Sequence, residues 1–157
     1  MSLDKIEIVE YQDKYKDYYR KLACEWLNKY DLYEPVDEEI INNPYSMIID
    51  NGGYIYFARY KEEIVGTVSL FKLNNKVFEL GKLAVTGEFQ GLGIGNKLVK
   101  YAIDTLKKIG AQKVILYSNS RLKKAANLYK KFGFTRVSFD DEKYETADIK
   151  MEKIIDN

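Results

Sequence analysis

The stretch ELGKLAVTGEFQGLGIGNKLVKYA, residues 79–102, decides the fold of this sequence. Near its middle, three glycines alternate within five residues, and a helical apolar pattern follows at once. A glycine-rich turn into a helix exposes backbone N–H groups at the positive end of the helix dipole, where a phosphate can bind. We therefore expect a phosphate-bearing ligand at this turn. On the glycines alone, a plain strand-to-helix turn is an equally good interpretation.

Two familiar phosphate motifs do not fit the spacing of these glycines. The dinucleotide fingerprint G-x-G-x-x-G, started at Gly91, requires a third glycine where Asn96 stands. The P-loop G-x-x-x-x-G-K-[ST] requires glycine at the same position, and a hydroxyl where Leu98 stands. What remains is a Q-x-x-G-x-G pattern over residues 90–95, directly before a helix, and glycine lets the backbone approach a ligand closely.

The strand before the turn changes its alternation in the middle. Phe78 and Leu80 set one parity of apolar residues, whereas Leu83 and Val85 set the opposite parity. A slip of one residue in a strand is what a β-bulge produces. Because Gly81 lies between the two pairs, we expect a bulge there. Its backbone polar groups should splay from the neighbouring strand and be free for a ligand.

Apolar periodicity predicts the remaining elements, and we see no repeat, low-complexity tract or linker. Strands are expected at residues 6–10, 54–60, 64–73, 76–85, 113–117, 134–139 and 147–153, and helices at 15–30, after Pro35, from the glycine turn to Gly110, and at 121–132. The order β-α-α-β-β-β-α-β-α-β-β predicts an α/β protein with a mixed sheet and a single domain over residues 1–157. The apolar face of the helix before Gly110 is expected to comprise Leu98, Val99, Ala102, Ile103, Leu106 and Ile109.

The 157-residue chain has a net charge of +1, one cysteine (Cys24) and no histidine. The near-neutral charge gives no reason to expect nucleic-acid binding, and no apolar run reaches the roughly 18 residues of a membrane span. A single cysteine excludes an internal disulfide and is compatible with a reducing cytoplasm, which is the expected location. The absence of histidine excludes Ser-His and Cys-His nucleophile pairs and histidine-ligated zinc, so acid–base chemistry falls to Glu, Asp, Tyr, Lys or water.

Two motifs resemble those of the GNAT superfamily of N-acetyltransferases. The first is the acyl-CoA-binding pattern [QR]-x-x-G-x-[GA], matched by residues 90–95 after a strand that bulges in that family. The second is AANLYKKFGF, residues 125–134, which resembles the family's helix ending in Y-x-x-x-G-F. The likeness covers residues 54–138 well. It implies an α/β fold with a mixed, mostly antiparallel central sheet flanked by helices, and a bulged strand at about residues 77–86.

The resemblance implies acetyl-CoA as the acyl donor and no metal. Backbone groups of the bulged strand would pair with the pantetheine arm like an added strand, and the glycine turn would hold the pyrophosphate. One departure is Leu122, where many members carry asparagine, and Asn119 nearby is a hypothetical substitute. The residues implied at the cofactor site are Leu83, Ala84, Val85, Gln90, Gly91, Leu92, Gly93, Ile94, Gly95, Asn96 and Asn119.

Charge is divided unevenly along the chain. Residues 97–136 are rich in Lys and Arg and contain Asp104 as their only acid, whereas residues 25–50 are rich in acids and contain Lys29 as their only base. The basic segment suits a phosphorylated nucleotide. Solvated helix faces are the alternative explanation for most of these lysines. The candidates for contact with the 3′-phosphate of the cofactor are Arg121, Lys123 and Lys124.

Glu79 and Tyr129 are the expected catalytic residues. Acyl transfer needs a neutral amine, and a free alkyl ammonium has a pKa of about 10.4, so a base is required. Glu79 lies just before the predicted bulge, where several superfamily members place a glutamate; its alternative is a solvated carboxylate at a strand edge. Tyr129 matches the motif tyrosine and would donate a proton to the departing sulfur; its alternative is a core residue on an apolar helix face. A backbone N–H of the bulged strand, that of Val85, would stabilise the oxyanion.

We therefore expect an N-acetyltransferase that moves an acetyl group from acetyl-CoA to a primary amine of a small molecule or peptide, by direct attack in a ternary complex. Cys24 is expected to be structural, because the chain has no histidine to activate it. The alternative is a non-catalytic acyl-CoA-binding or regulatory domain. A basic nucleic-acid module fits poorly, because no nucleic-acid motif is present. Members of the superfamily often dimerise, so a homodimer is compatible with the resemblance.

Overall fold

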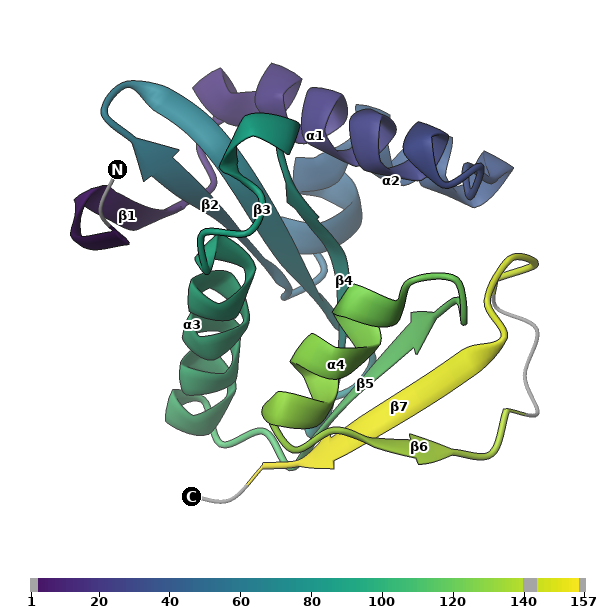
Figure 1. Ribbon diagram of the computed structural model, residues 1–157. Helices are drawn as coiled ribbons and strands as arrows, with labels where there is room; N and C mark the ends of the chain where they lie inside the picture. The colour runs from purple at the N-terminus through teal and green to yellow at the C-terminus, as the bar shows by residue number, and fades with distance from the viewer. Residues whose placement is uncertain (1–2, 140–143, 156–157) are drawn as a thin grey trace.

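A seven-stranded sheet organises the chain, in the order β1-β2-β3-β4-β5-β7-β6 (Figure 1). The computed structural model describes residues 3–139 and 144–155. Within these residues the neighbouring strands are antiparallel, except for the parallel pair β4 and β5. The predicted order of elements and the mixed, mostly antiparallel sheet are confirmed. The strands are β1 (Ile6–Glu10), β2 (Tyr54–Tyr60), β3 (Glu63–Lys72), β4 (Val77–Val85), β5 (Lys113–Ser118), β6 (Thr135–Val137) and β7 (Ile149–Ile154).

Two pairs of helices cover the two faces of this sheet (Figure 1). The helices α1 (Lys16–Lys29) and α2 (Pro35–Asn42) lie on one face, and α3 (Ile94–Lys108) and α4 (Lys123–Lys131) lie on the other. Each helix turns its apolar stripe to the sheet because burying that stripe is the main favourable contribution to folding. Short helical turns are η1 (Leu3–Lys5), η2 (Asp13–Tyr15), η3 (Tyr45–Ile49) and η4 (Gly87–Phe89).

The predicted apolar face of α3 is confirmed at all of its positions except the last. Ile109 is 43% exposed, because α3 ends at Lys108 and the chain turns away at Gly110, whose φ is +75°. A left-handed residue after the last turn is a common way to end a helix. The face that packs on the sheet therefore stops one helical turn earlier than the periodicity predicts, at Leu106.

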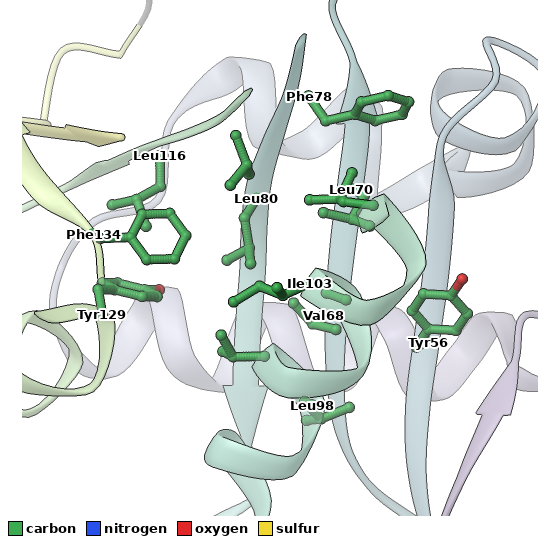
Figure 2. Close-up of a cluster of buried hydrophobic side chains, with 14 of the residues drawn as sticks. Tyr56, Val68, Leu70, Phe78, Leu80, Leu98, Ile103, Leu116, Tyr129 and Phe134 are labelled. Atoms are coloured by element: carbon green, nitrogen blue, oxygen red, sulfur yellow. The ribbon is translucent and has the colours of Figure 1, made fainter. Parts of the chain in front are cut away.

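The larger hydrophobic cluster fills the space between the sheet and the α3–α4 layer, as Figure 2 shows. Val68 and Leu70 of β3 and Leu80 of β4 face Leu98 of α3 there. The ring of Tyr129 from α4 lies beside the ring of Phe134, with the ring centroids 5.7 Å apart. The second motif of the sequence therefore closes one end of this core.

β4 contains the bulge that its alternation predicts, but the extra residue is not the glycine. Ser69 of β3 opposes Gly81 and Thr67 opposes Ala84, so Lys82 and Leu83 share one position of the ladder. Lys82 has a φ of +51°, in the left-handed region that non-glycine residues rarely adopt. The predicted position of the bulge, Gly81, is therefore wrong by one residue.

Gly81 is needed for a different reason. A Cβ atom at this position would lie 3.1 Å from Cε2 of Phe71 on the adjacent strand, which is tighter than ordinary contacts between side chains. The glycine therefore allows the ring of Phe71 to lie against the backbone of β4 just before the bulge. After the bulge, Leu83 and Val85 return to the same face of the sheet as Leu80.

The sheet forks beside the bulge. β4 and β5 pair over three positions, from Val77 opposite Lys113 to Glu79 opposite Ile115. Beyond Glu79 the two strands have no further pairing in the described part of the chain, although β4 continues to Val85. After the bulge, Ala84 and Val85 stay paired with β3, and the other edge of β4 faces the gap of the fork.

Candidate functional site

The glycine turn places the first N–H groups of α3 at the mouth of this fork. Gly91 and Gly93 have φ values of +79° and +87°, and Gly93 is the N-cap residue of α3. The side chain of Gln90 donates from Nε2 to the carbonyl oxygen of Val85 at 2.9 Å, and so ties the turn back to β4. The first N–H groups of a helix have no acceptor within the helix, so they are available to an anion.

A groove of about 610 Å³ runs along the fork and over the glycine turn. Most residues predicted for the cofactor line it: Leu83, Ala84, Val85, Gln90, Gly91, Gly93, Ile94, Gly95, Asn96, Arg121 and Lys124. Lys123 and Tyr129 line it as well. No Asp or Glu does so among the described residues, and hence the groove suits a polyanion.

Two predicted cofactor residues lie elsewhere. Leu92 is 41% exposed and does not line the groove. Asn119 faces the neighbouring cavity, where its Nδ2 donates to the carbonyl oxygen of Thr146 at 2.6 Å. Its Oδ1 accepts from the backbone N–H of Arg121 at 2.9 Å. Both ends of the Asn119 amide are therefore engaged, one with the segment before β7 and the other with the chain before α4.

A second cavity, of about 100 Å³, opens on the other side of the fork. Five residues line both the groove and this cavity, so the two spaces meet at these side chains. The shared residues are Trp26, Leu83, Leu122, Ala125 and Tyr129. Molecules bound in the groove and in the cavity would therefore meet at these side chains.

The charged groups of the cavity are three carboxylates and one ammonium, as far as the structure describes its lining. Glu79 is 2% exposed, so it is not a solvated carboxylate at a strand edge. Tyr144 donates a hydrogen bond from its hydroxyl to Oε2 of Glu79 at 2.8 Å. Burial, and then the charge of Glu79, raise the pKa of Tyr144, so this phenol stays protonated and keeps donating.

The other two carboxylates each hold a neighbouring segment. Asp37 of α2 forms an ion pair with Lys82 of the bulge, and its second oxygen accepts the N–H of Glu34 at 2.8 Å. Glu34 accepts from the backbone N–H of Glu145 at 2.7 Å and from the hydroxyl of Thr146 at 2.6 Å. Two regions that are distant in sequence, the start of α2 and the segment before β7, thus form one wall of the cavity.

Tyr129 carries a buried hydroxyl without a hydrogen-bond partner in the described part of the chain. The residue is 8% exposed, and burial raises the pKa of its phenol. Native proteins rarely leave such groups unsatisfied, and the exceptions tend to have a functional reason. Tyr129 lines both spaces, so a ligand bound at their junction could accept a hydrogen bond from this hydroxyl.

Several residues of the cavity were not anticipated from the sequence. Trp26 lies in a helical stripe and looks like a core residue. Lys82 and Tyr144 stand in no motif, and their positions depend on the bulge and on the chain between β6 and β7. Glu34 and Asp37 differ from these residues, because the acidic segment 31–39 is one that the sequence offers for attracting a cationic amine. A helix start explains the carboxylate of Asp37 equally well from the sequence, since it accepts the N–H three residues earlier.

The forked mixed sheet and the glycine-rich entry to α3 together define the N-acetyltransferase fold. The sequence model of the acetyltransferase (GNAT) family matches residues 8–134. The chain therefore belongs to this family and is an acyltransferase. The resemblance inferred from the two motifs is confirmed.

Individual relatives agree with this assignment. The chain is 26% identical to the N-alpha-acetyltransferase 30 of Schizosaccharomyces pombe over 129 residues, which cover 78% of this chain and 81% of that protein. A GNAT-family acetyltransferase from Staphylococcus aureus Mu50 superposes with a TM-score of 0.83 at 23% identity, covering 96% and 99% of the two chains. The spermidine N-acetyltransferase of Vibrio cholerae, solved with CoA and spermine, gives a TM-score of 0.75 at 18% identity, covering 97% and 96%.

Two other kinds of feature are absent from the described residues. No helix in residues 3–139 or 144–155 has the length and apolar character of a membrane span. Within the same residues, no group of three or more His, Cys, Asp or Glu side chains is arranged to hold a metal ion.

Proposed function

We propose that this protein transfers the acetyl group of acetyl-CoA to a primary amine, with both substrates bound at once. The observation that carries this proposal is the buried hydroxyl of Tyr129, which has no hydrogen-bond partner within residues 3–139 and 144–155 and belongs to a residue at the junction of a basic groove and an acidic cavity. A groove without acids suits the phosphates of CoA, and a cavity with excess carboxylates suits an ammonium. The CoA-bound relative from Vibrio cholerae supports the same choice of donor.

The groove residues would bind and align the donor. The free N–H groups at the start of α3 suit the pyrophosphate, and Arg121 and Lys124 suit the 3′-phosphate. The open edge of β4, from Leu83 to Val85, offers backbone groups to the amides of the pantetheine arm, as an added strand would. A hydrogen bond from a backbone N–H in this segment would also stabilise negative charge on the acetyl oxygen.

Glu79 is the proposed base. Keeping an alkyl amine neutral at pH 7 costs roughly 4–5 kcal/mol in water, given a pKa of about 10.4. A carboxylate in the acceptor cavity can take the proton of the ammonium directly or through one water. The hydrogen bond from Tyr144 helps to fix the orientation of the Glu79 carboxylate in the cavity.

Tyr129 is the proposed proton donor. The amine nitrogen forms a bond to the acetyl carbon while the carbon–sulfur bond breaks, and the sulfur receives the phenolic proton to give the free thiol. The nitrogen's second proton restores the phenol, so the reaction releases one proton overall. Burial favours the neutral phenol, which is the form that can donate.

A non-catalytic acyl-CoA-binding domain is the competing function. Isothermal titration calorimetry would measure binding of acetyl-CoA, and a thiol-specific reagent would follow release of CoA with a panel of primary amines. We expect binding together with thiol release that depends on the amine. Binding without release for every amine would reject the transferase and favour the binding domain, whereas absence of binding would reject both.

A further inference from the structure

We propose that the acceptor is a compact, positively charged primary amine, and not the N-terminus of a peptide. This inference rests on the proposed function, and it narrows the range of amines that the cavity accepts. It follows from three independent observations: the volume of the cavity, the bonds that close one of its walls, and the charges that line it.

The volume of the cavity suits an acceptor with only a few atoms beyond the reacting nitrogen. The cavity measures about 100 Å³. For comparison, a dry engineered cavity of about 150 Å³ holds one benzene molecule, which has six carbon atoms. By that scale the cavity takes roughly four non-hydrogen atoms, about the carbon chain of butylamine, whereas the first two residues of a peptide contain about ten or more.

One wall of the cavity, formed by the start of α2 and the segment before β7, is closed by hydrogen bonds. Glu34 receives the N–H groups of Glu145 and Thr146 and the hydroxyl of Thr146, at 2.7, 3.3 and 2.6 Å. The carboxylate is 6% exposed. Opening this wall would leave a buried charge without its donors, which is more costly than losing a neutral hydrogen bond. We call this set of three bonds the Glu34 latch.

The lining favours a cation with an apolar body. Three carboxylates face one ammonium among the described lining residues, so the excess charge is negative. The rings of Trp26, Phe71 and Tyr117 also line the cavity. Aromatic faces attract cations and pack against short hydrocarbon chains. An anionic or zwitterionic acceptor would bring an unpaired negative charge to this lining.

The test compares acceptors by their kcat/KM in the thiol-release assay. The panel contains butylamine, β-alanine, spermidine and an alanine tetrapeptide with a free N-terminus. We expect butylamine to exceed each of the others by at least about tenfold, a margin that shape and charge complementarity can supply. Equal or better activity with the tetrapeptide or spermidine overturns the size argument, and equal activity with β-alanine overturns the charge argument. If none of the four amines causes thiol release, the proposed function itself is rejected.

Opening the latch should broaden the choice of acceptor. In Glu34→Ala we expect the preference for butylamine over the tetrapeptide to fall at least about tenfold. Glu38→Ala is the matched control, because Glu38 is an exposed residue of the same helix and does not line the cavity. An unchanged preference in a folded Glu34→Ala protein contradicts the proposal. If that variant does not fold, Phe71→Ala tests the same point by enlarging the cavity from another strand.

Discussion

At the scale of single residues, Tyr129 combines two properties that conflict in an ordinary core. Its ring packs against Phe134 like any core aromatic, but its hydroxyl has no described partner. An unsatisfied buried polar group costs about 1–3 kcal/mol. The site thus gives up some stability, and the proposed catalytic role supplies the reason.

Tyr129→Phe removes this hydroxyl and keeps the packing of the ring. We expect kcat to fall about 100-fold, which is within the range for loss of a general acid. The Tm should stay the same or rise, because an unsatisfied group has been removed. Steady-state kinetics and thermal melting measure the two effects. A lower Tm with unchanged kcat would show that Tyr129 is only a core residue.

Glu79→Gln keeps the size of the side chain and an oxygen that can accept the hydrogen bond of Tyr144. We expect kcat with butylamine to fall about 100-fold, because the amide cannot take the proton of the ammonium. Calorimetry should give an unchanged affinity for acetyl-CoA, since Glu79 does not line the groove. Activity equal to the wild type would remove Glu79 as the base.

At the scale of elements, the turn into α3 depends on one glycine more than on its neighbour. Gly93 has a φ of +87°, and a Cβ there would lie 3.1 Å from the side chain of Leu3. Gly95 has no such φ, and a Cβ there would meet Leu128 at 3.6 Å, an ordinary contact. The pair therefore offers a matched comparison within one motif.

Gly93→Ala should destabilise the protein by about 1–2 kcal/mol, the cost of a left-handed conformation for an L-residue. It should also weaken binding of acetyl-CoA, because the N–H groups of the turn are displaced. Gly95→Ala should leave the free energy of unfolding unchanged. Urea denaturation and calorimetry measure both effects. Equal stability of the two variants would mean that the turn does not need the left-handed conformation at position 93.

The second prediction at this scale concerns the ion pair between α2 and the bulge. Lys82 and Asp37 have side chains only 10% and 3% exposed. Lys82→Met or Asp37→Asn alone leaves one buried charge unpaired, which costs about 3–5 kcal/mol. The double variant should be markedly more stable than the sum of the two losses predicts. Strict additivity in urea denaturation would show that the two charges do not interact.

Elements were predictable where local pattern decides them. The helices and strands follow from runs such as YIYFARY, residues 54–60, whose periodicity matches β2. The bulge was visible as a change of parity, but its position was missed, because Lys82 adopts a conformation that its residue type disfavours. Ile109 was misplaced because periodicity does not show which residue ends a helix.

The groove and the cavity also differ in how far the sequence predicts them. The groove is built largely from one continuous motif, so its residues could be predicted, with Leu92 and Asn119 as exceptions. The cavity is assembled from α1, α2, α4, three strands (β3, β4 and β5) and the segment before β7. Tyr144 and Thr146 enter it through tertiary contacts with Glu79 and Glu34, which no local spacing indicates.

At the scale of the whole molecule, the chain has fourteen tyrosines and no histidine. Burial raises the pKa of Tyr19 and Tyr129, and raises that of Tyr56 to about 12. The ordinary value of about 10 applies in the unfolded chain. Above pH 10 the unfolded state therefore binds fewer protons than the folded state, and stability falls as pH rises.

We expect the free energy of unfolding to fall above pH 10 by up to about 1.4 kcal/mol per pH unit for each fully buried tyrosine. Below pH 10 this contribution is fully present. Tyr19→Phe should reduce the slope between pH 10 and 12, because one of these phenols is removed. Urea denaturation over this range measures the slope. The same slope in wild type and Tyr19→Phe would contradict the assignment.

The fork also gives the molecule a mechanical property. Two sheet segments, β1 to β4 and β5 to β7, meet through a ladder of three residue pairs. Because this ladder is much shorter than the one between β2 and β3, we expect the sheet to bend more readily at the fork than within that pair of strands. A donor bound between the two segments would then restrict that bending.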